Sequence, residues 1–194
     1  TFGAQDMQDS LKKLRWPGGT AVVWAGDFDG CAKLEEVVFG EGVTEIADSN
    51  SRGGAFRNCT SLRSVTFPST LKKIGSSAFE GDTELSEIKN LEVVEEIGEY
   101  AFYNCKCPAS LTVGAEKIGK GAFWYNGKEG GLTEVTFLSG VKTIGDYAFY
   151  NHKALKKVSL PEGLETIEYS VFGHTGVEEL IVPDSVTTFG AQDM

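Results

Sequence analysis

The sequence has few basic residues and no long apolar run. It carries 18 Lys and Arg against 28 Asp and Glu, which gives a formal net charge of −10. A nucleic-acid-binding surface or a polybasic membrane-binding segment needs an excess of positive charge, so both classes are disfavoured. No window approaches the roughly 18 apolar residues of a membrane-spanning helix. We therefore expect no nucleic-acid partner and no membrane span.

The sequence also lacks the common catalytic motifs. G-x-S-x-G, H-E-x-x-H, G-x-x-x-x-G-K-[ST] and Cys-x-x-Cys are all absent. The two histidines, His152 and His174, have no neighbouring Cys or carboxylate to complete a metal site, so we interpret them as turn residues. The sequence therefore predicts no catalytic residue, no metal site and no cofactor.

Proline is scarce, and four of the five prolines close copies of one repeated block. The first part of the repeat, Ile-Gly-x-x-Ala-Phe, occurs at 74–79, 97–102, 118–123 and 144–149. Counting degenerate copies, its final residue is an anchor phenylalanine at Phe28, Phe56, Phe79, Phe102, Phe123, Phe149 and Phe172. A second block, Leu-x-x-Val-x-Leu-Pro, follows the anchor, as at 62–68, 155–161 and 177–183, and the block at 11–17 reveals an eighth copy.

The two blocks predict a coil with two extended segments. In Leu-x-x-Val-x-Leu the Val and the second Leu point inward like alternate residues of a strand, and Pro ends the strand. The Ile begins a second extended segment on the opposite side. The position two residues after the anchor holds Gly30, Asn58, Gly81, Asn104 or Asn151, which indicates a left-handed backbone there. One coil buries too little alone, so we predict a mainly β repeat solenoid of eight coils of about 23 residues.

The full pattern, Ile-Gly-x-x-Ala-Phe-x-x-Cys-x-x-Leu-x-x-Val-x-Leu-Pro, resembles the BspA-like (Treponema pallidum-type) leucine-rich repeats of bacterial and protist surface proteins. Residues 56–68 match it nearly throughout, and the resemblance covers essentially the whole chain. It implies a right-handed horseshoe or solenoid with a parallel β-sheet on one face. It also implies an extracellular or cell-surface, non-enzymatic role in adhesion or protein–protein interaction. Extra residues around 48–52 and 127–131, and Pro108 in place of Leu, should bulge without breaking the solenoid.

Three of the four cysteines occupy one repeat position. Cys31, Cys59 and Cys105 each lie three residues after an anchor, and Cys107 lies outside the pattern. Stacking at strand spacing would place Cys31 and Cys59 roughly 5 Å apart, within disulfide reach. Buried free thiols are the favoured interpretation, and a Cys31–Cys59 bridge is the alternative.

Binding in solenoids commonly uses the outward positions of the strands. Here these residues, which we call the strand face, are Lys13, Arg15, Glu36, Ser64, Thr66, Glu87, Lys89, Ser110, Thr112, Glu134, Thr136, Lys157, Ser159 and Glu179, with Val38 and Ile181 completing the pairs. The face is polar, of mixed sign and without an aromatic hot spot. It is either a shallow protein- or glycan-binding surface or a solvated sheet whose Ser and Thr favour strands.

Aromatic residues that could anchor a ligand lie outside the strand face. A patch of Trp124 and Tyr125 beside the 127–131 insertion is the second candidate site. Further tyrosines, Tyr100, Tyr147, Tyr150 and Tyr169, also lie outside the strand positions.

The heptapeptide at 1–7 is repeated without change at 188–194. Phe2 and Phe189 take the Ile position, and Met7 and Met194 take the anchor position. We interpret 1–194 as a single solenoid domain, one 187-residue block plus a seven-residue seam, cut from a longer array; a deliberately duplicated seam is the alternative. End-to-end contact through Phe2, Met7, Phe189 and Met194 would build a filament. The two functional hypotheses are a surface recognition module and a structural subunit of a long solenoid or filament.

Overall fold

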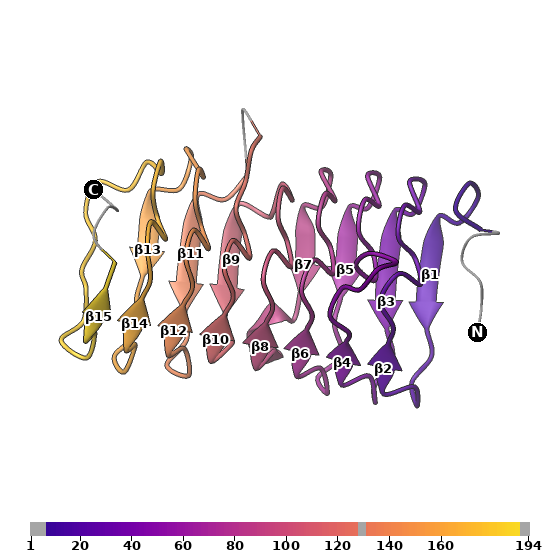
Figure 1. The fold of residues 1–194 in the computed structure, drawn as a ribbon, viewed down its shortest axis with the longest axis horizontal. Helices are drawn as coiled ribbons and strands as arrows, with labels where there is room; N and C mark the ends of the chain where they lie inside the picture. Colours follow the sequence, from indigo (N-terminus) through magenta and orange to yellow (C-terminus); the bar gives the residue numbers. More distant parts are fainter. Residues whose placement is uncertain (1–6, 128–130, 191–194) are drawn as a thin grey trace.

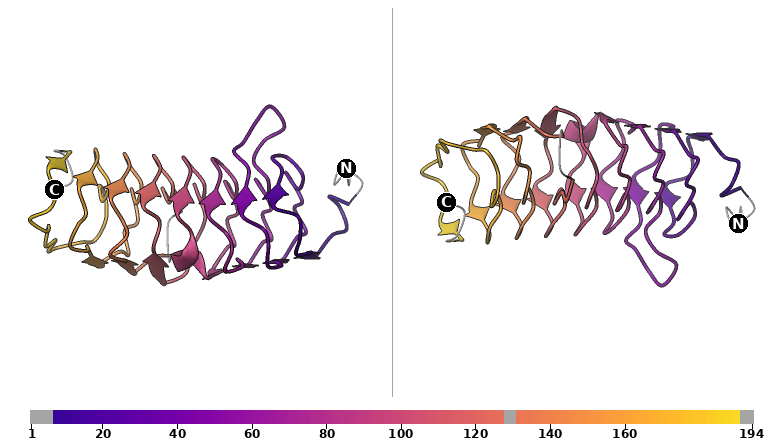
Figure 2. Two further views of the ribbon diagram at one scale, coloured as in Figure 1. Left: turned by 90° about the horizontal axis from the view of Figure 1, so that it is seen from below. Right: turned by 90° about the horizontal axis from the view of Figure 1, so that it is seen from above.

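The computed structural model describes residues 7–127 and 131–190. These residues stack coil upon coil into a long, nearly straight solenoid whose two ends lie at opposite extremes (Figure 1 and Figure 2). Among the described residues, each of the first seven coils contributes one short strand to one side of the stack, and all eight coils contribute a two-residue strand to the other side. The predicted mainly β solenoid is therefore confirmed.

The Leu-x-x-Val-x-Leu blocks form two parallel sheets on one side of the solenoid. The first has the order β1-β3-β5-β7 and consists of β1 (Lys13–Trp16), β3 (Glu36–Phe39), β5 (Ser64–Thr66) and β7 (Glu87–Lys89). The second consists of β9 (Ser110–Val113), β11 (Glu134–Phe137) and β13 (Lys157–Ser159). Val37, Val65 and Val135 occupy the paired central positions and are buried, so the predicted inward alternation is confirmed.

These two sheets are separate because the ladder stops between β7 and β9. After β7 the chain enters a left-handed residue, Asn90 (φ 63°), and a 3₁₀ turn, η2 (Leu91–Val93). Before β9 stands Pro108, which has no N–H to donate to a neighbouring strand, and Cys107 precedes it with φ 58°. The departure that the sequence shows at Pro108 thus interrupts one sheet, although the solenoid itself continues.

The Ile positions form an unbroken parallel sheet of eight strands on the other side. Its strands are β2 (Val22–Val23), β4 (Glu45–Ile46), β6 (Lys73–Ile74), β8 (Glu96–Ile97), β10 (Lys117–Ile118), β12 (Thr143–Ile144), β14 (Thr166–Ile167) and β15 (Thr188–Phe189). Each pairs in register with its neighbours, including β4 with β6 across the 48–52 insertion, which loops out of the stack (Figure 2). A glycine follows most of these strands because neighbouring coils touch there: a Cβ on Gly98 would lie 2.5 Å from the Ser76 nitrogen.

The core is a continuous ladder of the anchor phenylalanines. Consecutive rings from Phe28 to Phe172 stack with centroids 5.0 to 6.0 Å apart. All of these rings are buried, and the inward Leu, Val and Ile residues of both sides pack around them. Stacking of coils therefore supplies the hydrophobic core that no single coil has.

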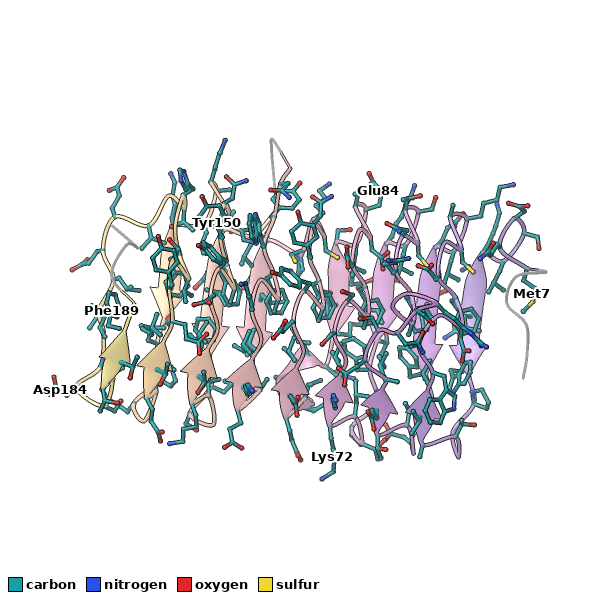
Figure 3. The ribbon with its side chains drawn as sticks, viewed as in Figure 1. Met7, Lys72, Glu84, Tyr150, Asp184 and Phe189 are labelled. Atoms are coloured by element: carbon teal, nitrogen blue, oxygen red, sulfur yellow. The ribbon has the colours of Figure 1, made fainter. Side chains whose placement is uncertain are left out.

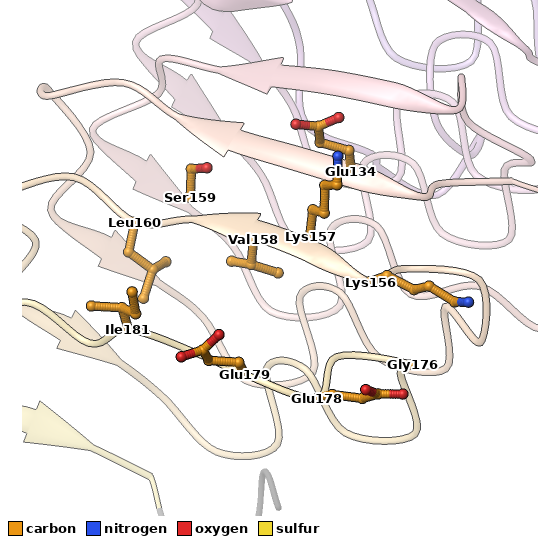
Figure 4. Close-up of a pocket in the computed structure, with 10 residues that line it drawn as sticks. All are labelled: Glu134, Lys156, Lys157, Val158, Ser159, Leu160, Gly176, Glu178, Glu179 and Ile181. Atoms are coloured by element: carbon orange, nitrogen blue, oxygen red, sulfur yellow. The ribbon is translucent and has the colours of Figure 1, made fainter.

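The prediction of a strand in the last block, at 177–183, is wrong. These residues are described, and they form no strand and make no backbone hydrogen bond to β13. The turn from Phe172 to Val177 advances five positions, whereas the turn from Phe149 to Leu155 advances six, so the block arrives out of place for pairing. A cleft of about 720 Å³ separates it from β13 (Figure 4), and Ile181 is 78% exposed.

Candidate functional site

The residues of the strand face lie on the outer side of the two short sheets. Those in strands alternate with buried positions, and most are exposed or half-buried. Part of their charge is already paired, since Lys13 and Arg15 lie 3.2 and 3.4 Å from Glu36, and Lys89 lies 2.9 Å from Glu87. The gap between β7 and β9 divides the face, and Glu179 stands beyond the cleft. The strand face is thus a polar and discontinuous surface.

A cluster of aromatic side chains forms a second surface on the turns around the anchors. Trp124 lies at its centre, with ring centroids 5.7 Å from Tyr103, 5.4 Å from Tyr147 and 5.0 Å from Tyr150. Tyr100 extends the cluster through Tyr103 at 5.8 Å, and a further tyrosine and a histidine extend it through Tyr147 and Tyr150. We call this set the aromatic surface; its members are Tyr100, Tyr103, Trp124, Tyr147, Tyr150 and Tyr169. Figure 3 places Tyr150 among the turns that carry the surface.

The fold does not require aromatic residues at these positions. The position after the anchor holds Tyr103, Trp124 and Tyr150 in three consecutive coils. In the other coils the same position holds Asp29, Arg57, Glu80 and Gly173. The rings of adjacent coils pack on one another here, whereas the other coils stack without aromatic residues at this position.

Two of the tyrosines also occupy an unfavourable backbone conformation. The position two residues before the anchor is left-handed in all described coils with an anchor phenylalanine except that of Phe56, and Tyr100 and Tyr147 adopt φ 55° and 57° there. Gly121 and Ser170 hold the same position in other coils at φ 59° and 51°. A bulky residue in this region is strained, and such strain is concentrated at functional sites. This left-handed position is additional to the predicted one after the anchor, which Asn58, Asn104 and Asn151 confirm.

The surroundings of the aromatic surface combine polar contacts with one cation. The Trp124 Nε1 donates to the Asn126 Oδ1 at 3.1 Å, and the Asn126 Nδ2 donates to the Tyr103 hydroxyl at 2.7 Å. The Lys120 ammonium lies 6.0 Å from the Tyr147 ring centroid, a cation–π contact. The pKa of Tyr147 is raised by desolvation and by the neighbouring Tyr169 and Asp146.

Trp124 and Tyr125, which the sequence suggests as an aromatic patch, pack against different neighbours. Trp124 belongs to the aromatic surface, whereas the Tyr125 ring stacks on the buried His152 ring with centroids 5.4 Å apart. Burial raises the pKa of the Tyr125 hydroxyl. Tyr103, which the sequence analysis did not single out, takes the place beside Trp124 instead.

The position three residues after the anchor is a slot that is buried in five of the seven described coils with an anchor phenylalanine. The Cys59 and Cys105 thiols donate to the carbonyls of Phe28 and Phe79 at 3.3 and 2.9 Å. All four cysteines are free and buried, so the structure has buried thiols and no Cys31–Cys59 bridge. Burial raises the pKa of Cys107 to about 12 and that of Cys105 well above its usual value, as expected for unreactive thiols.

The two histidines serve separate structural contacts. The His152 Nε2 lies 2.6 Å from the Phe123 carbonyl, to which it donates, and burial lowers the pKa of His152 to about 4. His174 is exposed and packs against Tyr150. Within residues 7–127 and 131–190, no group of His, Cys, Asp and Glu could hold a metal ion, and no helix is long and apolar enough to cross a membrane.

The proposed seam residues are partly described. Met7 is half-buried, and Phe189 pairs with Ile167 in β15 and is 38% exposed. Phe2 and Met194 lie outside the described residues. Figure 3 shows Met7 and Phe189 at opposite ends of the solenoid.

Comparisons with known proteins agree with this repeat architecture. The sequence model of the BspA type leucine-rich repeat region matches in 6 copies over residues 6–129 and 116–192. No curated protein matches the sequence. Two solved leucine-rich repeat proteins are similar at 24% identity. One, from Bacteroides ovatus, covers 94% of this chain with a TM-score of 0.62, and one from T. pallidum covers 84% with a TM-score of 0.70. This chain spans 56% of the first protein and 76% of the second.

Proposed function

The chain belongs to the BspA-type leucine-rich repeat family, and from that premise we propose that it is a non-enzymatic, extracellular or cell-surface module that binds another protein in adhesion. Proteins of this family are generally surface proteins, and leucine-rich repeat solenoids typically serve as scaffolds for protein contacts. The aromatic surface is the binding site that we assign to this module.

The observation that carries the proposal is the confinement of the aromatic surface to the coils of Phe102, Phe123 and Phe149, together with the adjoining Tyr169. Trp and Tyr are the residues that most often dominate the energy of protein interfaces, because they bury a large area at a small cost in side-chain entropy. The strand face has no such residues, and the gap between β7 and β9 divides it.

The ring geometry favours a protein over a glycan as the ligand. A polysaccharide that stacks on several aromatic residues needs an open ring face at each of them. Here the Tyr103 and Trp124 planes are inclined by 79°, and those of Trp124 and Tyr150 by 66°. An uneven surface of ring edges and faces instead suits the irregular side chains of a protein.

The test is binding to an array of secreted and cell-surface ectodomains, with a glycan array measured in parallel. We expect saturable binding to at least one ectodomain. The double variant Trp124→Arg/Tyr147→Ser should weaken it about thirtyfold or more, as for removal of a hot spot. Both substitutions use residues that the chain itself carries at these repeat positions, Arg57 and Ser170, so the fold should be retained.

The matched control is Thr112→Ala/Thr136→Ala on the strand face, which should bind like the wild type. Loss of binding in this control with full binding in Trp124→Arg/Tyr147→Ser would move the site to the strand face. Binding to glycans alone, or no saturable binding on either array, would overturn the proposal.

A further inference from the structure

We propose that Asn126 is a site of intramolecular deamidation, in which the main-chain nitrogen of Gly127 attacks the Asn126 side chain and leaves a carboxylate within the aromatic surface. The reaction needs water and no other co-reactant. The modification can be measured on the free protein, and only its effect on a partner rests on the proposed function.

The dipeptide Asn126-Gly127 offers the least hindered main-chain nitrogen that follows any asparagine of the chain. Asn126 is the only asparagine that precedes a glycine. The others, which precede Ser, Cys, Leu or His, are Asn50, Asn58, Asn90, Asn104 and Asn151. Glycine has no Cβ to obstruct the approach of its nitrogen, and its backbone adopts the widest range of conformations. Because nucleophile and amide belong to one chain, ring closure to a succinimide proceeds at a high effective concentration.

Asn126 is exposed, although it holds the repeat position of the slot, three residues after the anchor Phe123. The equivalent residues that are buried are Cys31, Cys59, Asp82, Cys105 and His152. The backbone of this coil differs as well. The position two residues after the anchor is left-handed in every other described coil with an anchor phenylalanine, but not at Tyr125. Water therefore reaches the Asn126 amide and can hydrolyse a succinimide formed there.

The attacking nitrogen is not held by the fold. The Gly127 N–H donates no hydrogen bond to any residue that the structure describes. Residues 124–127 belong to no helix or strand, where a main-chain N–H is normally engaged in a backbone hydrogen bond. The Gly127 nitrogen is thus free to turn toward the Asn126 Cγ.

Two side chains of the aromatic surface contact the reacting amide. The Trp124 Nε1 donates to the Asn126 Oδ1 at 3.1 Å, and Oδ1 becomes negatively charged when the nitrogen adds to Cγ. A donor placed at such an oxygen stabilises the charge as it forms. The Asn126 Nδ2 lies 2.7 Å from the Tyr103 hydroxyl, which can pass its proton to Nδ2 as the amine leaves. Trp124 and Tyr103 therefore assist the addition and the departure, respectively.

The reaction consumes water and releases ammonia, with no change of oxidation state. The bond between the Gly127 nitrogen and the Asn126 Cγ forms, the Gly127 proton passes to solvent, and the Cγ–Nδ2 bond breaks. Water then opens the succinimide at either carbonyl. Opening at Cγ gives aspartate, and opening at the main-chain carbonyl gives isoaspartate, in which the main chain runs through the former side chain.

Either product changes the charge of the aromatic surface beside Trp124 and Tyr103. The Nδ2 that donates to the Tyr103 hydroxyl is lost, and a carboxylate takes the place of the neutral amide. A negative charge introduced into a largely apolar contact surface opposes its burial by a partner. Deamidation would therefore reduce, with time, the partner binding proposed above for this surface.

The test is incubation of the full chain at neutral and mildly alkaline pH, followed by digestion at acid pH and mass spectrometry of every peptide that contains asparagine. We expect the amide-to-acid mass change, with isoaspartate, to accumulate at Asn126 about tenfold or more faster than at any other asparagine. The variants Trp124→Phe and Tyr103→Phe keep an aromatic ring. Each should slow the reaction about threefold or more, because the donor to Oδ1 or the acid at Nδ2 is removed.

The matched control is Tyr150→Phe, which removes the hydroxyl from another ring packed on Trp124, with centroids 5.0 Å apart. It should deamidate like the wild type. Reaction at Asn126 no faster than at Asn104, or unchanged rates in both Trp124→Phe and Tyr103→Phe, would overturn the proposal.

The effect on a partner is measured separately, with an ectodomain that binds the wild type. Asn126→Asp should bind it about fivefold or more weakly, whereas Asn126→Gln, which stays neutral, should keep its binding after incubation. Deamidation at Asn126 without any ectodomain that binds would count against the proposed function alone. Equal binding by Asn126→Asp and the wild type would overturn the effect of deamidation on the aromatic surface.

Discussion

Asp82 provides a quantitative test of the buried slot that follows each anchor. It is fully buried, its Oδ1 accepts the Cys59 N–H at 2.8 Å, and its Oδ2 has no hydrogen-bond partner among the described residues. Burial raises the pKa of Asp82 well above its usual value; the Cys59 N–H opposes this, and Asp29 adds to it. Three other residues of the slot, Cys59, Cys105 and His152, donate to an anchor carbonyl of the preceding coil, and an ionised carboxylate cannot donate.

The perturbation is Asp82→Asn, which keeps an oxygen acceptor, supplies a donor and does not titrate. In the wild type the folded-state pKa lies above the unfolded-state value. The resulting stabilisation is complete below about pH 4, where both states are protonated, and is lost as the pH rises toward the folded-state pKa. The loss amounts to about 1.4 kcal/mol per pH unit. The variant escapes this loss, so its advantage over the wild type should grow by that amount per pH unit above about pH 4.

The assay is urea unfolding of the wild type and Asp82→Asn at a series of pH values between acid and neutral. The difference in free energy of unfolding cancels every other titrating group that the two proteins share. Glu84→Gln, which neutralises an exposed carboxylate in the same turn, is the control and should follow the wild type. A difference between Asp82→Asn and the wild type that is independent of pH would refute the reasoning.

Three further predictions concern the same stack. His152→Asn should remove an acid sensitivity of about 3 kcal/mol in the free energy of unfolding. Burial lowers the pKa of His152 to about 4, so its contribution to stability is complete above the unfolded-state pKa of about 6.5 and is lost as the pH falls from about 6.5 to 4. Urea unfolding at both pH values measures the loss. Gly98→Ala should lower the free energy of unfolding by about 1–3 kcal/mol, because the added Cβ clashes with Ser76. The control, Gly140→Ala, should cost little, because its Cβ would lie 3.5 Å from its nearest neighbour. Equal melting temperatures of the two variants would contradict this. Phe102→Ala should cost about 3–5 kcal/mol, since it removes a fully buried ring stacked on both sides, and a loss below about 1 kcal/mol in urea unfolding would show that the ladder is not the main core.

Much of the fold could be predicted from the sequence because each coil repeats the same physical solution. The nine-residue spacing from Val65 to Ile74 places both residues in paired strands, and the sheet of Ile positions keeps its register even from Leu111 to Ile118, where two residues are missing. A buried anchor and a left-handed Asn follow from residue type alone. These features can be predicted from the types of the residues and from their spacing along the chain.

The rest depends on lengths and contacts that single positions do not reveal. One residue is missing between Phe172 and Val177, and the block that follows forms no strand, although Leu180 and Pro183 keep the pattern of one. The aromatic surface joins residues of different coils. Tyr103 could have been found only by comparing the position after each anchor along the chain, a comparison in which aromatic residues stand out against Arg57 and Glu80.

The gap between β7 and β9 has a consequence for how the molecule opens. On one side of the stack, hydrogen bonds between coils are interrupted there, and the two-residue strands β8 and β10 continue the opposite sheet across the gap. In a solenoid, cooperativity is transmitted only between neighbouring coils. The chain should therefore unfold as two cooperative blocks that part near Pro108, and native-state hydrogen exchange should give two protection levels that change there.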